Sequence, residues 1–306
     1  MNSPKGQGPV AIAKQLSAVY QLSISPGTIR HWMVGDRKPR GKIRNPFKQK
    51  SSPALSYVIG ANIGDGCTLT DNWIVRLEVT DRDFAEAFNS SMATLFSRET
   101  PNKILSRRFK VKRLPMYVVR YSCKSLVKLL RLPLKKLLEI AYKFPREFLR
   151  GFFDAEGHVD VGVGNQFSLA VGAENSNKLL LLRLKQLLKE LGIDSRFERK
   201  RKAGTIMVTR GEALAMRRTM YSVIIGKVTA VRDFAKEIGF SIRRKNQKLK
   251  DALSIIATCN PRARPAMWNQ MYSKTGGEWV RKGELTSLRE SKSIKVEFPA
   301  SSVSGQ

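Results

Sequence analysis

The chain has 306 residues, and its 56 lysines and arginines outnumber 25 aspartates and glutamates to give a formal net charge of +31. A hydrophobic content of 42% indicates a folded core rather than a disordered basic chain. Because the excess of cations runs along the whole chain, we expect a polyanionic partner, with duplex DNA or structured RNA ahead of a ribosomal or membrane-surface role.

Three cysteines, Cys67, Cys123 and Cys259, form no CxxC pair, and an odd number is typical of a reducing cytosol. Only His31 and His158 could join them, so we expect no zinc site. No secretory signal opens the chain, and no run of about 18 apolar residues could span a membrane. These features predict a cytoplasmic protein, associated with the nucleoid, or an organellar one in a eukaryote.

Residues 1–53 hold ten lysines and arginines and one acid. Apolar spacing predicts a helix over residues 10–20, and Ser25 followed by Pro26 is a typical helix start. Two short helices with a tight turn indicate a helix-turn-helix whose Arg30 contacts DNA, with packing on the main domain as the alternative. The basic residues 37–46 would form a linker that follows phosphates.

Residues 54–250 contain an internal repeat. Residues 57–66 and 148–157 each end in a D-G or E-G pair, and the final glycines are 157 − 66 = 91 positions apart. In both copies a strand-like run and a helix follow. The offsets pair Leu77 with Leu169, Phe109 with Phe197, and Leu126 with Leu214.

The repeat predicts an α+β fold with pseudo-twofold symmetry, in which each half runs helix, hairpin, helix, hairpin, helix. We place the first half at residues 54–145 and the second at 146–256. Residues 257–306 are expected to form a weakly ordered tail, because Pro261, Pro265 and the pair Gly276–Gly277 interrupt any long element. Trp268 and Trp279 could dock this tail on the body.

Basic residues gather on the expected hairpins. Alternation of apolar and basic residues over 109–112 indicates a half-buried strand with an open basic face, which suits the major groove of DNA. A merely solvated strand face is the alternative. The residues that we expect to contact DNA in the two halves are Arg108, Lys110, Lys112, Arg120, Arg196, Lys200, Lys202 and Arg243.

Each repeated motif is predicted to be a short helix with small residues four positions apart. Gly60 and Gly64 share one face of the first helix, and Gly151 and Ala155 hold the same positions in the second. Such helices can pack backbone to backbone, which would bring their C-terminal ends together.

Asp65 and Glu156 stand at those two helix ends. Two carboxylates there repel one another and the negative ends of both helix dipoles, and a divalent cation would relieve the conflict. Oxygen ligands favour Mg²⁺ or Mn²⁺, which could activate water and stabilise the leaving oxygen of a phosphodiester. The alternative is that both acids only cap helices or bind surface lysines.

Residues 149–157, Leu-Arg-Gly-Phe-Phe-Asp-Ala-Glu-Gly, resemble the LAGLIDADG homing endonuclease motif, and residues 58–66 are the companion copy. The first copy departs from the second by having Ile63 where Asp154 stands. The resemblance covers about residues 54–250 and implies two αββαββα halves that form a saddle of two antiparallel sheets on DNA. It also implies a monomer that cuts both strands across the minor groove and leaves short 3′ overhangs.

The resemblance further implies metal-binding roles for Asp65 and Glu156. It suggests a basic residue near each metal-bound water, for which Lys245 and Lys136 are the candidates in the second and first halves. Arg243 or Lys135 could serve instead, and ordinary phosphate contact is the alternative role for all four.

The favoured function is therefore a metal-dependent homing endonuclease acting on double-stranded DNA. One alternative is an RNA maturase for a group I or archaeal intron, with intron RNA as partner. Another is a catalytically silent DNA-binding regulator on the same fold, which the helix-turn-helix would suit and the two acids would not. An intein is less favoured, because the chain begins with Met and lacks a terminal His-Asn pair.

Overall fold

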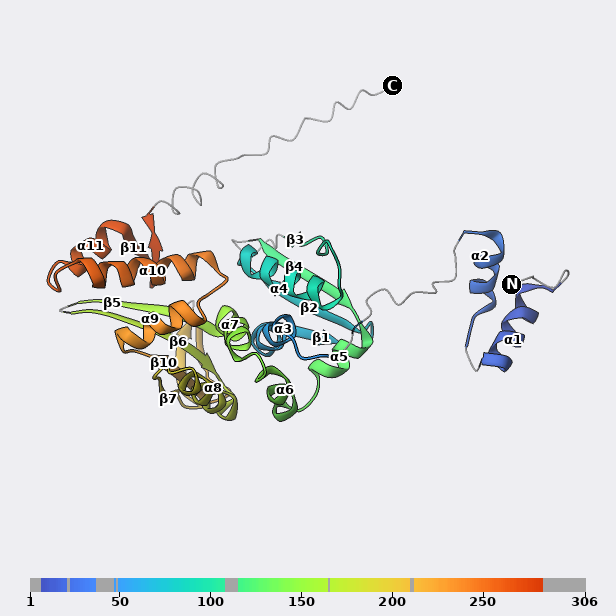
Figure 1. Ribbon diagram of the computed structural model, residues 1–306, viewed down its shortest axis with the longest axis horizontal. Helices are drawn as coiled ribbons and strands as arrows, with labels where there is room; N and C mark the ends of the chain where they lie inside the picture. Colours follow the sequence, from blue (N-terminus) through green and yellow to red (C-terminus); the bar gives the residue numbers. More distant parts are fainter. Residues whose placement is uncertain are drawn as a thin grey trace, which may run out of the picture. The chain divides into compact units, whose positions relative to one another are not determined.

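The computed structural model describes residues 7–20, 23–36, 47, 49–107, 115–164, 166–209 and 212–282. The chain divides into two compact units, residues 1–46 and 47–306 (Figure 1). This boundary lies before the predicted one at 53/54, because Phe47 packs its ring against Phe96, 6.3 Å away between centroids. The two predicted halves, 54–145 and 146–256, belong to one compact unit.

The N-terminal unit contains two helices in contact, α1 (Pro9–Tyr20) and α2 (Pro26–Val34). Ser25 begins α2 as predicted, since its side chain accepts a hydrogen bond from the amide of Thr28 at 3.2 Å. Gly35 ends the helix with a φ of 85°, a conformation that glycine adopts without strain. Ala13 and Ile29 are buried between the helices.

The first half of the larger unit is an antiparallel sheet of order β1-β2-β4-β3. Its helices α4 and α5 pack on the sheet, and α3 packs on α4 and α6. The elements in chain order are α3 (Pro53–Gly64), β1 (Gly66–Leu69), β2 (Ile74–Val79), α4 (Arg82–Leu95), β3 (Leu105–Arg107), β4 (Met116–Ser122), α5 (Lys124–Leu130) and α6 (Leu134–Ala141).

The second half repeats this arrangement with a sheet of order β5-β6-β10-β7, on which α8 and α9 pack. A separate two-stranded ribbon, β8-β9, is inserted between β7 and β10. The elements are α7 (Pro145–Glu156), β5 (Gly157–Val163), β6 (Phe167–Asn175), α8 (Lys178–Glu190), β7 (Arg196–Arg201), β8 (Ile206–Thr209), β9 (Glu212–Ala215), β10 (Met220–Ile225), α9 (Val228–Glu237) and α10 (Arg243–Thr258). The α+β architecture agrees with the sequence prediction.

Strand register corrects two of the predicted residue pairings. Gly66 pairs with Leu77 across β1 and β2, and Gly157 pairs with Ala173 across β5 and β6, so Ala173 and not Leu169 is the counterpart of Leu77. The second hairpin is longer, which shifts the offset. The pairing of Leu126 with Leu214 is also wrong, because Leu126 is buried in α5 whereas Leu214 is exposed on β9, in the inserted ribbon.

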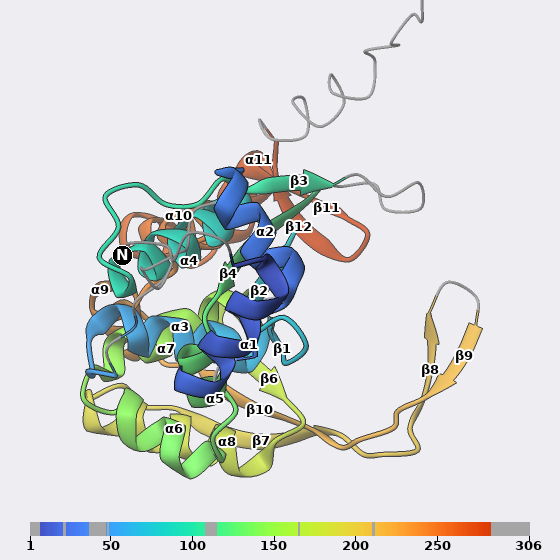
Figure 2. The same ribbon diagram turned by 90° about the vertical axis from the view of Figure 1, so that its right-hand side faces the viewer.

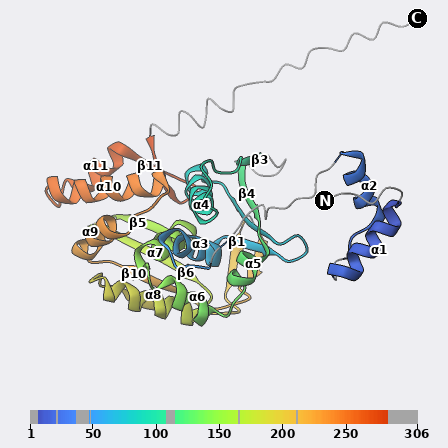
Figure 3. The ribbon, with the colours of Figure 1, turned by 45° about the vertical axis from the view of Figure 1, so that its right-hand side comes forward.

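The expected tail is wrong for residues 264–281, which form α11 (Arg264–Met271), β11 (Tyr272–Thr275) and β12 (Glu278–Arg281). Trp268 is fully buried and stacks on Tyr272 at 4.0 Å between ring centroids. The indole nitrogen of Trp279 donates to the carbonyl of Val161 at 3.0 Å. This C-terminal segment therefore covers β5, an edge strand of the second sheet (Figure 3).

Pro265 and the pair Gly276–Gly277 do not interrupt order, because they sit where elements begin or turn. Pro265 lies in the first turn of α11, and both glycines adopt positive φ in the β11-β12 turn. Among the described residues, no helix is long and apolar enough to cross a membrane.

Candidate active site

The site begins at the contact between the two motif helices, α3 and α7, which lie side by side (Figures 1 and 3). A Cβ built on Gly60 would lie 2.2 Å from the carbonyl oxygen of Phe148, and one built on Gly151 would lie 2.2 Å from that of Tyr57. Real Cβ atoms do not approach this closely, so only glycine fits at both positions. The two contacts are reciprocal, which is the mark of the pseudo-twofold axis.

The same contact continues to the C-terminal ends of both helices. A Cβ on Gly64 would lie 2.4 Å from the Cβ of Ala155 and 3.1 Å from the Cγ of Glu156. Glu156 is the last residue of α7, and Asp65 caps α3 with its amide bonded to the carbonyl of Ala61 at 3.0 Å. The structure therefore brings together the four small residues and the two acids that the sequence singled out.

Both acids are held in an environment that disfavours their charge. Burial is the main cause that raises the pKa of Asp65, and the nearby Asp81 adds to it. Burial also raises the pKa of Glu156, and Asp65 contributes by repulsion, while a hydrogen bond from Asn175 at 2.9 Å and the Lys245 charge lower it. The two carboxyls are thus close enough to interact, and each retains solvent contact.

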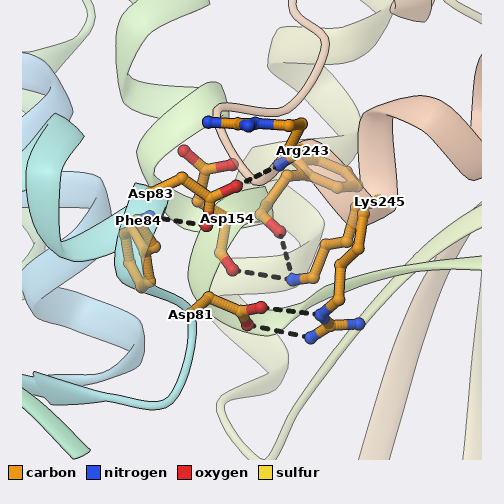
Figure 4. Close-up of polar contacts among 8 residues, drawn as sticks. Asp81, Asp83, Phe84, Asp154, Arg243 and Lys245 are labelled. Carbon is orange, nitrogen blue, oxygen red and sulfur yellow. Dashed lines mark hydrogen bonds and ion pairs between the residues drawn. The ribbon is translucent and has the colours of Figure 1, made fainter. Parts of the chain in front are cut away.

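Lys245 is a cation whose charge acts on both acids. Its side chain is only 8% exposed, and its Nζ donates to the carbonyl oxygens of Asp154 at 2.7 Å and Phe153 at 3.4 Å (Figure 4). Burial and the neighbouring Arg244 lower the pKa of Lys245 to about 8. The ammonium group therefore binds the last turn of α7, beneath Glu156, and its charge opposes the negative end of the helix dipole.

The N-terminal end of α10, which carries Lys245, is fixed to the first half. Arg244 forms a two-bond ion pair with Asp81, at 2.7 and 2.9 Å, and the amide of Arg243 donates to the carboxylate of Asp83 (Figure 4). Asp81 and Asp83 lie at the start of α4. An element of the second half thus reaches across to the first and positions the lysine at the centre.

Asp154 is a buried acid that the sequence analysis did not assign to a role. Its carboxylate accepts hydrogen bonds from the hydroxyl of Tyr57 and from the amide of Ser241, each at 2.8 Å. Burial raises its pKa, although both hydrogen bonds oppose the shift. The bonds join α7 to α3 and to the loop before α10. Asp154 could have been recognised from the sequence as an acid on a helix face that is otherwise apolar.

Comparison with known proteins identifies the family to which the chain belongs. The sequence model of the LAGLIDADG-like domain matches residues 143–239, from the loop before α7 to the end of α9. Over 246 residues the chain is 32% identical to the uncharacterized protein MJ0398 of Methanocaldococcus jannaschii, covering 79% of this chain and 86% of the relative. The chain belongs to the LAGLIDADG family. A second uncharacterized protein of that organism, MJ0314, is 29% identical over 166 residues, which is 50% of this chain and 60% of the relative.

Solved structures align with much of the chain at low sequence identity and low TM-score. Variants of the homing endonuclease I-DmoI align with 66% of this chain and 99% of theirs, at 17% identity and a TM-score of 0.43. I-DmoI in complex with DNA and Mn aligns with 62% and 98%, at 17% identity and 0.38. Full-length DUF199/WhiA from Thermatoga maritima aligns with 74% and 68%, at 14% identity and 0.42.

The sheets of this LAGLIDADG protein carry some of the cations expected to contact DNA. Arg120 on β4 lies directly opposite Arg76 on β2, and the Nε of Arg120 is buried without a hydrogen-bond partner. Like charges placed opposite each other destabilise a sheet, and here Glu78 on the same strand offsets the charge of Arg76 by forming an ion pair with it. Arg76 is not among the residues predicted from the sequence, although the alternation of β2 could have revealed it.

In the second half, Arg196 and Lys200 lie on β7, and Lys202 follows it. Lys200 pairs with Glu174 at 3.5 Å and Arg196 pairs with Glu198 at 3.6 Å, so acids partly neutralise this face. The remaining predicted contacts are outside this sheet. Arg30 is exposed on α2, the side chain of Arg243 is exposed at the start of α10, and Arg108, Lys110 and Lys112 lie outside the described residues.

Lys136 is not brought to the acidic pair. It lies exposed on α6, where it forms an ion pair with Glu139 at 3.0 Å. It is not among the charged groups that shift the pKa of Asp65 or Glu156. Lys136 in the first half therefore does not play the part that Lys245 plays in the second half.

The donor set of the site suits a hard divalent cation. Asp65 and Glu156 supply carboxylate oxygens, and burial raises the pKa of both although the charge of Lys245 opposes the shift. Among the described residues, no three His, Cys, Asp or Glu side chains gather to hold a metal by themselves. A cation bound by two carboxylates would keep water or take phosphate oxygens, which is the usual behaviour of Mg²⁺.

Proposed function

We propose that this protein is a metal-dependent endonuclease that binds double-stranded DNA and cuts both strands. The observation that carries the proposal is the convergence of Asp65 and Glu156 at the ends of two helices packed through glycine. Structural acids rarely converge at two negative helix ends, because the arrangement costs stability. One acid from each half, related by a pseudo-twofold axis, suits the two strands of a duplex.

Asp65 and Glu156 would hold the divalent cation, with Mg²⁺ or Mn²⁺ as the candidates. When bound, the cation supplies an activated water and charge stabilisation for the leaving oxygen. Asn175 orients the carboxylate of Glu156 through its hydrogen bond. Lys245, with a pKa of about 8, can hold or release a proton near neutral pH beside both acids. Arg244 and Asp154 keep the start of α10 in place.

Binding of duplex DNA is supported by the overall charge of +31. Neutralising phosphates releases counterions, so affinity should fall steeply with salt. The N-terminal unit would add contacts through exposed residues such as Arg30, and we propose that it acts as a helix-turn-helix. A monomer is sufficient, because one chain supplies both acids.

The test uses a plasmid library with a randomised duplex segment. Full-length protein selects bound duplexes in Ca²⁺, which serves as a binding-only condition, and Mg²⁺ is then added. We expect linear products whose ends map to one site. The Asp65→Asn/Glu156→Gln double variant, purified in parallel, should bind the same pool and cut none of it. Selective binding without any Mg²⁺-dependent cleavage would overturn the nuclease and favour a DNA-binding regulator.

A further inference from the structure

The outer side of α8 carries a row of lysines without acidic partners. Lys178, Lys185 and Lys189 lie 185 − 178 = 7 and 189 − 178 = 11 positions apart, so they share one side of the helix. None of them forms an ion pair with another residue in the part of the chain that the structure describes. The opposite side of α8 packs on β6, β7 and β10, so this row faces away from the sheet.

A cavity of about 180 Å³ opens at the end of this row, between α8 and the loop that leads to β7. Its lining residues are Lys185, Lys189, Gly192, Ile193, Asp194 and Ser195. The hydroxyl oxygen of Ser195 is buried and has no hydrogen-bond partner among the described residues. Asp194 forms an ion pair with Lys227 at 2.7 Å, which offsets its charge. A buried hydroxyl without a partner, beside two free lysines, matches the oxygens of a phosphate group. We call the row of lysines and this cavity the α8 surface.

The C-terminal end of α6 widens the α8 surface on one flank. Figures 2 and 3 show α6 beside α8. Burial raises the pKa of Tyr142 at the end of α6, and the charges of Arg183 and Glu190 on α8 also act on it, so the two helices are neighbours. Lys143 is exposed at this end and forms no ion pair with a described residue. Glu190 is the one acid of α8, against four basic residues.

The other residues of α8 argue against a lipid surface as the partner. Leu179 and Leu182 are exposed, but five further leucines of the helix are buried in the core of the second half. A helix that lies in a membrane interface needs a continuous apolar face to enter the headgroup boundary. In α8 that face is already occupied by the sheet.

The composition of the α8 surface also favours a duplex over single-stranded nucleic acid. Residues 178–195 contain no aromatic side chain on which an unpaired base could stack. Lysines and a hydroxyl suit the phosphate backbone, which a duplex presents on its outside. Once the sheets hold one part of a long DNA molecule, other segments of that molecule reach the α8 surface at a high effective concentration. This favours DNA over RNA.

We propose that the α8 surface binds the backbone of a second DNA duplex segment while the two sheets hold the first. One phosphate enters the cavity, where Lys185 and Lys189 contact it and the hydroxyl of Ser195 donates a hydrogen bond to one of its oxygens. Contacts to phosphates alone carry no sequence information, so any duplex can occupy the surface. This inference rests on the proposed binding of duplex DNA and does not depend on cleavage.

The test is a bridging assay with the full-length protein in Ca²⁺. The protein is loaded on an excess of a selected, biotinylated duplex fixed to beads, so that the sheets are occupied. A fluorescein-labelled duplex of unrelated sequence is then added at a series of NaCl concentrations. The loaded wild-type protein should retain the labelled duplex, and retention should fall steeply as the salt concentration rises.

Three variants test the residues of the α8 surface. Lys185→Gln/Lys189→Gln should lower the salt slope for the second duplex by nearly two, since each phosphate contact contributes about 0.9, and should weaken its retention at least about tenfold at about 0.1 M salt. Ser195→Ala should weaken retention about fivefold. Its thermal midpoint should not change, because the hydroxyl has no partner to lose within the described chain. The matched control is Lys124→Gln/Lys128→Gln, which removes two exposed lysines one turn apart from α5 and should bridge like the wild type.

Each outcome bears on a different part of the argument. Failure of the wild-type protein to load on the immobilised duplex would overturn the proposed binding of duplex DNA. A loaded protein that retains no second duplex would overturn the α8 surface alone. Equal bridging by the wild type and by both α8 variants would overturn it as well, because a dimer or the N-terminal unit would then account for bridging. Retention of an RNA duplex or of anionic vesicles in place of the DNA duplex would show that another polyanion binds there.

Discussion

The two halves of the large unit share a fold but differ at the residues next to their acids. Gly66 pairs with Leu77 and Gly157 pairs with Ala173, so Val79 and Asn175 occupy equivalent positions two residues further on. Asn175 donates a hydrogen bond to Glu156. Val79 is a buried apolar residue that has no group to offer Asp65.

Other residues near the acids also differ between the two halves. Asp154 in α7 stands where α3 has Ile63, and it anchors the loop before α10 through Ser241. Lys245 comes from the second half alone, while the first half contributes Asp81 as a clamp. The two halves therefore share a fold but surround their acids with different chemical groups. If the two acids serve two strands, their environments predict unequal cutting rates.

The largest expected effect comes from the acids themselves. Asp65→Asn or Glu156→Gln should reduce double-strand cleavage at least about a thousandfold, because a neutral amide is a poor ligand for Mg²⁺. DNA affinity in Ca²⁺ should persist, since the sheets are unchanged. Plasmid assays that resolve nicked from linear DNA measure both steps. Equal nicking of the same strand by both variants would contradict one acid per strand.

The glycine contact should behave symmetrically in spite of these differences. Gly60→Ala and Gly151→Ala should each lower the free energy of unfolding by about 3 kcal/mol, because the new Cβ meets a backbone oxygen that cannot move aside. Urea denaturation measures the effect. Gly164→Ala is the matched control, since a Cβ there meets nothing within 4 Å. A cost at only one of the two glycines would break the pseudo-twofold description.

The buried acid of the second half should matter more than its apolar counterpart. Asp154→Ala leaves the hydroxyl of Tyr57 and the amide of Ser241 unbonded, so we expect a loss of about 3 kcal/mol in stability. Ile63→Ala, at a partly exposed position, should cost about 1 kcal/mol. Thermal unfolding of both variants gives the ranking. The reverse order would show that the Asp154 network does not anchor the halves.

The smallest effect tests the difference between Asn175 and Val79. Because the hydrogen bond from Asn175 lowers the pKa of Glu156, its stabilisation is present above that pKa and is lost as pH falls through it. Asn175→Val should therefore cost about 1 kcal/mol at neutral pH and little in acid. Stability of metal-free protein measured against pH checks this. A cost that is equal at both pH values would indicate packing instead.

Much of the fold could be predicted from the sequence because the motif helices carry a strong signal. Gly60, Gly151 and the two acids are fixed by one backbone contact that recurs at a constant spacing. Away from that contact, a constant sequence spacing no longer identifies equivalent residues in the two halves. The longer β5-β6 hairpin moved the true counterpart of Leu77 to Ala173, and the inserted β8-β9 ribbon placed Leu214 outside the repeat.

The rest of the site depends on contacts between distant segments. Lys245 lies 91 residues from Asp154 along the chain, and Arg244 lies 163 residues from Asp81. No local pattern encodes such pairs. Similarly, Pro265 and the Gly276–Gly277 pair are compatible with an ordered segment and with a disordered one. The burial of Trp268 in the folded protein shows that the segment is ordered.

The bond between Trp279 and Val161 has a consequence for biosynthesis. The two residues are separated by 118 positions, so the strand is made long before the side chain that covers it. Residue 279 must leave the ribosome before its indole can bond to the carbonyl of Val161, so this contact with β5 forms late. A premature stop in the last helix or hairpin would release a chain with an uncovered strand edge, which proteases and chaperones recognise readily.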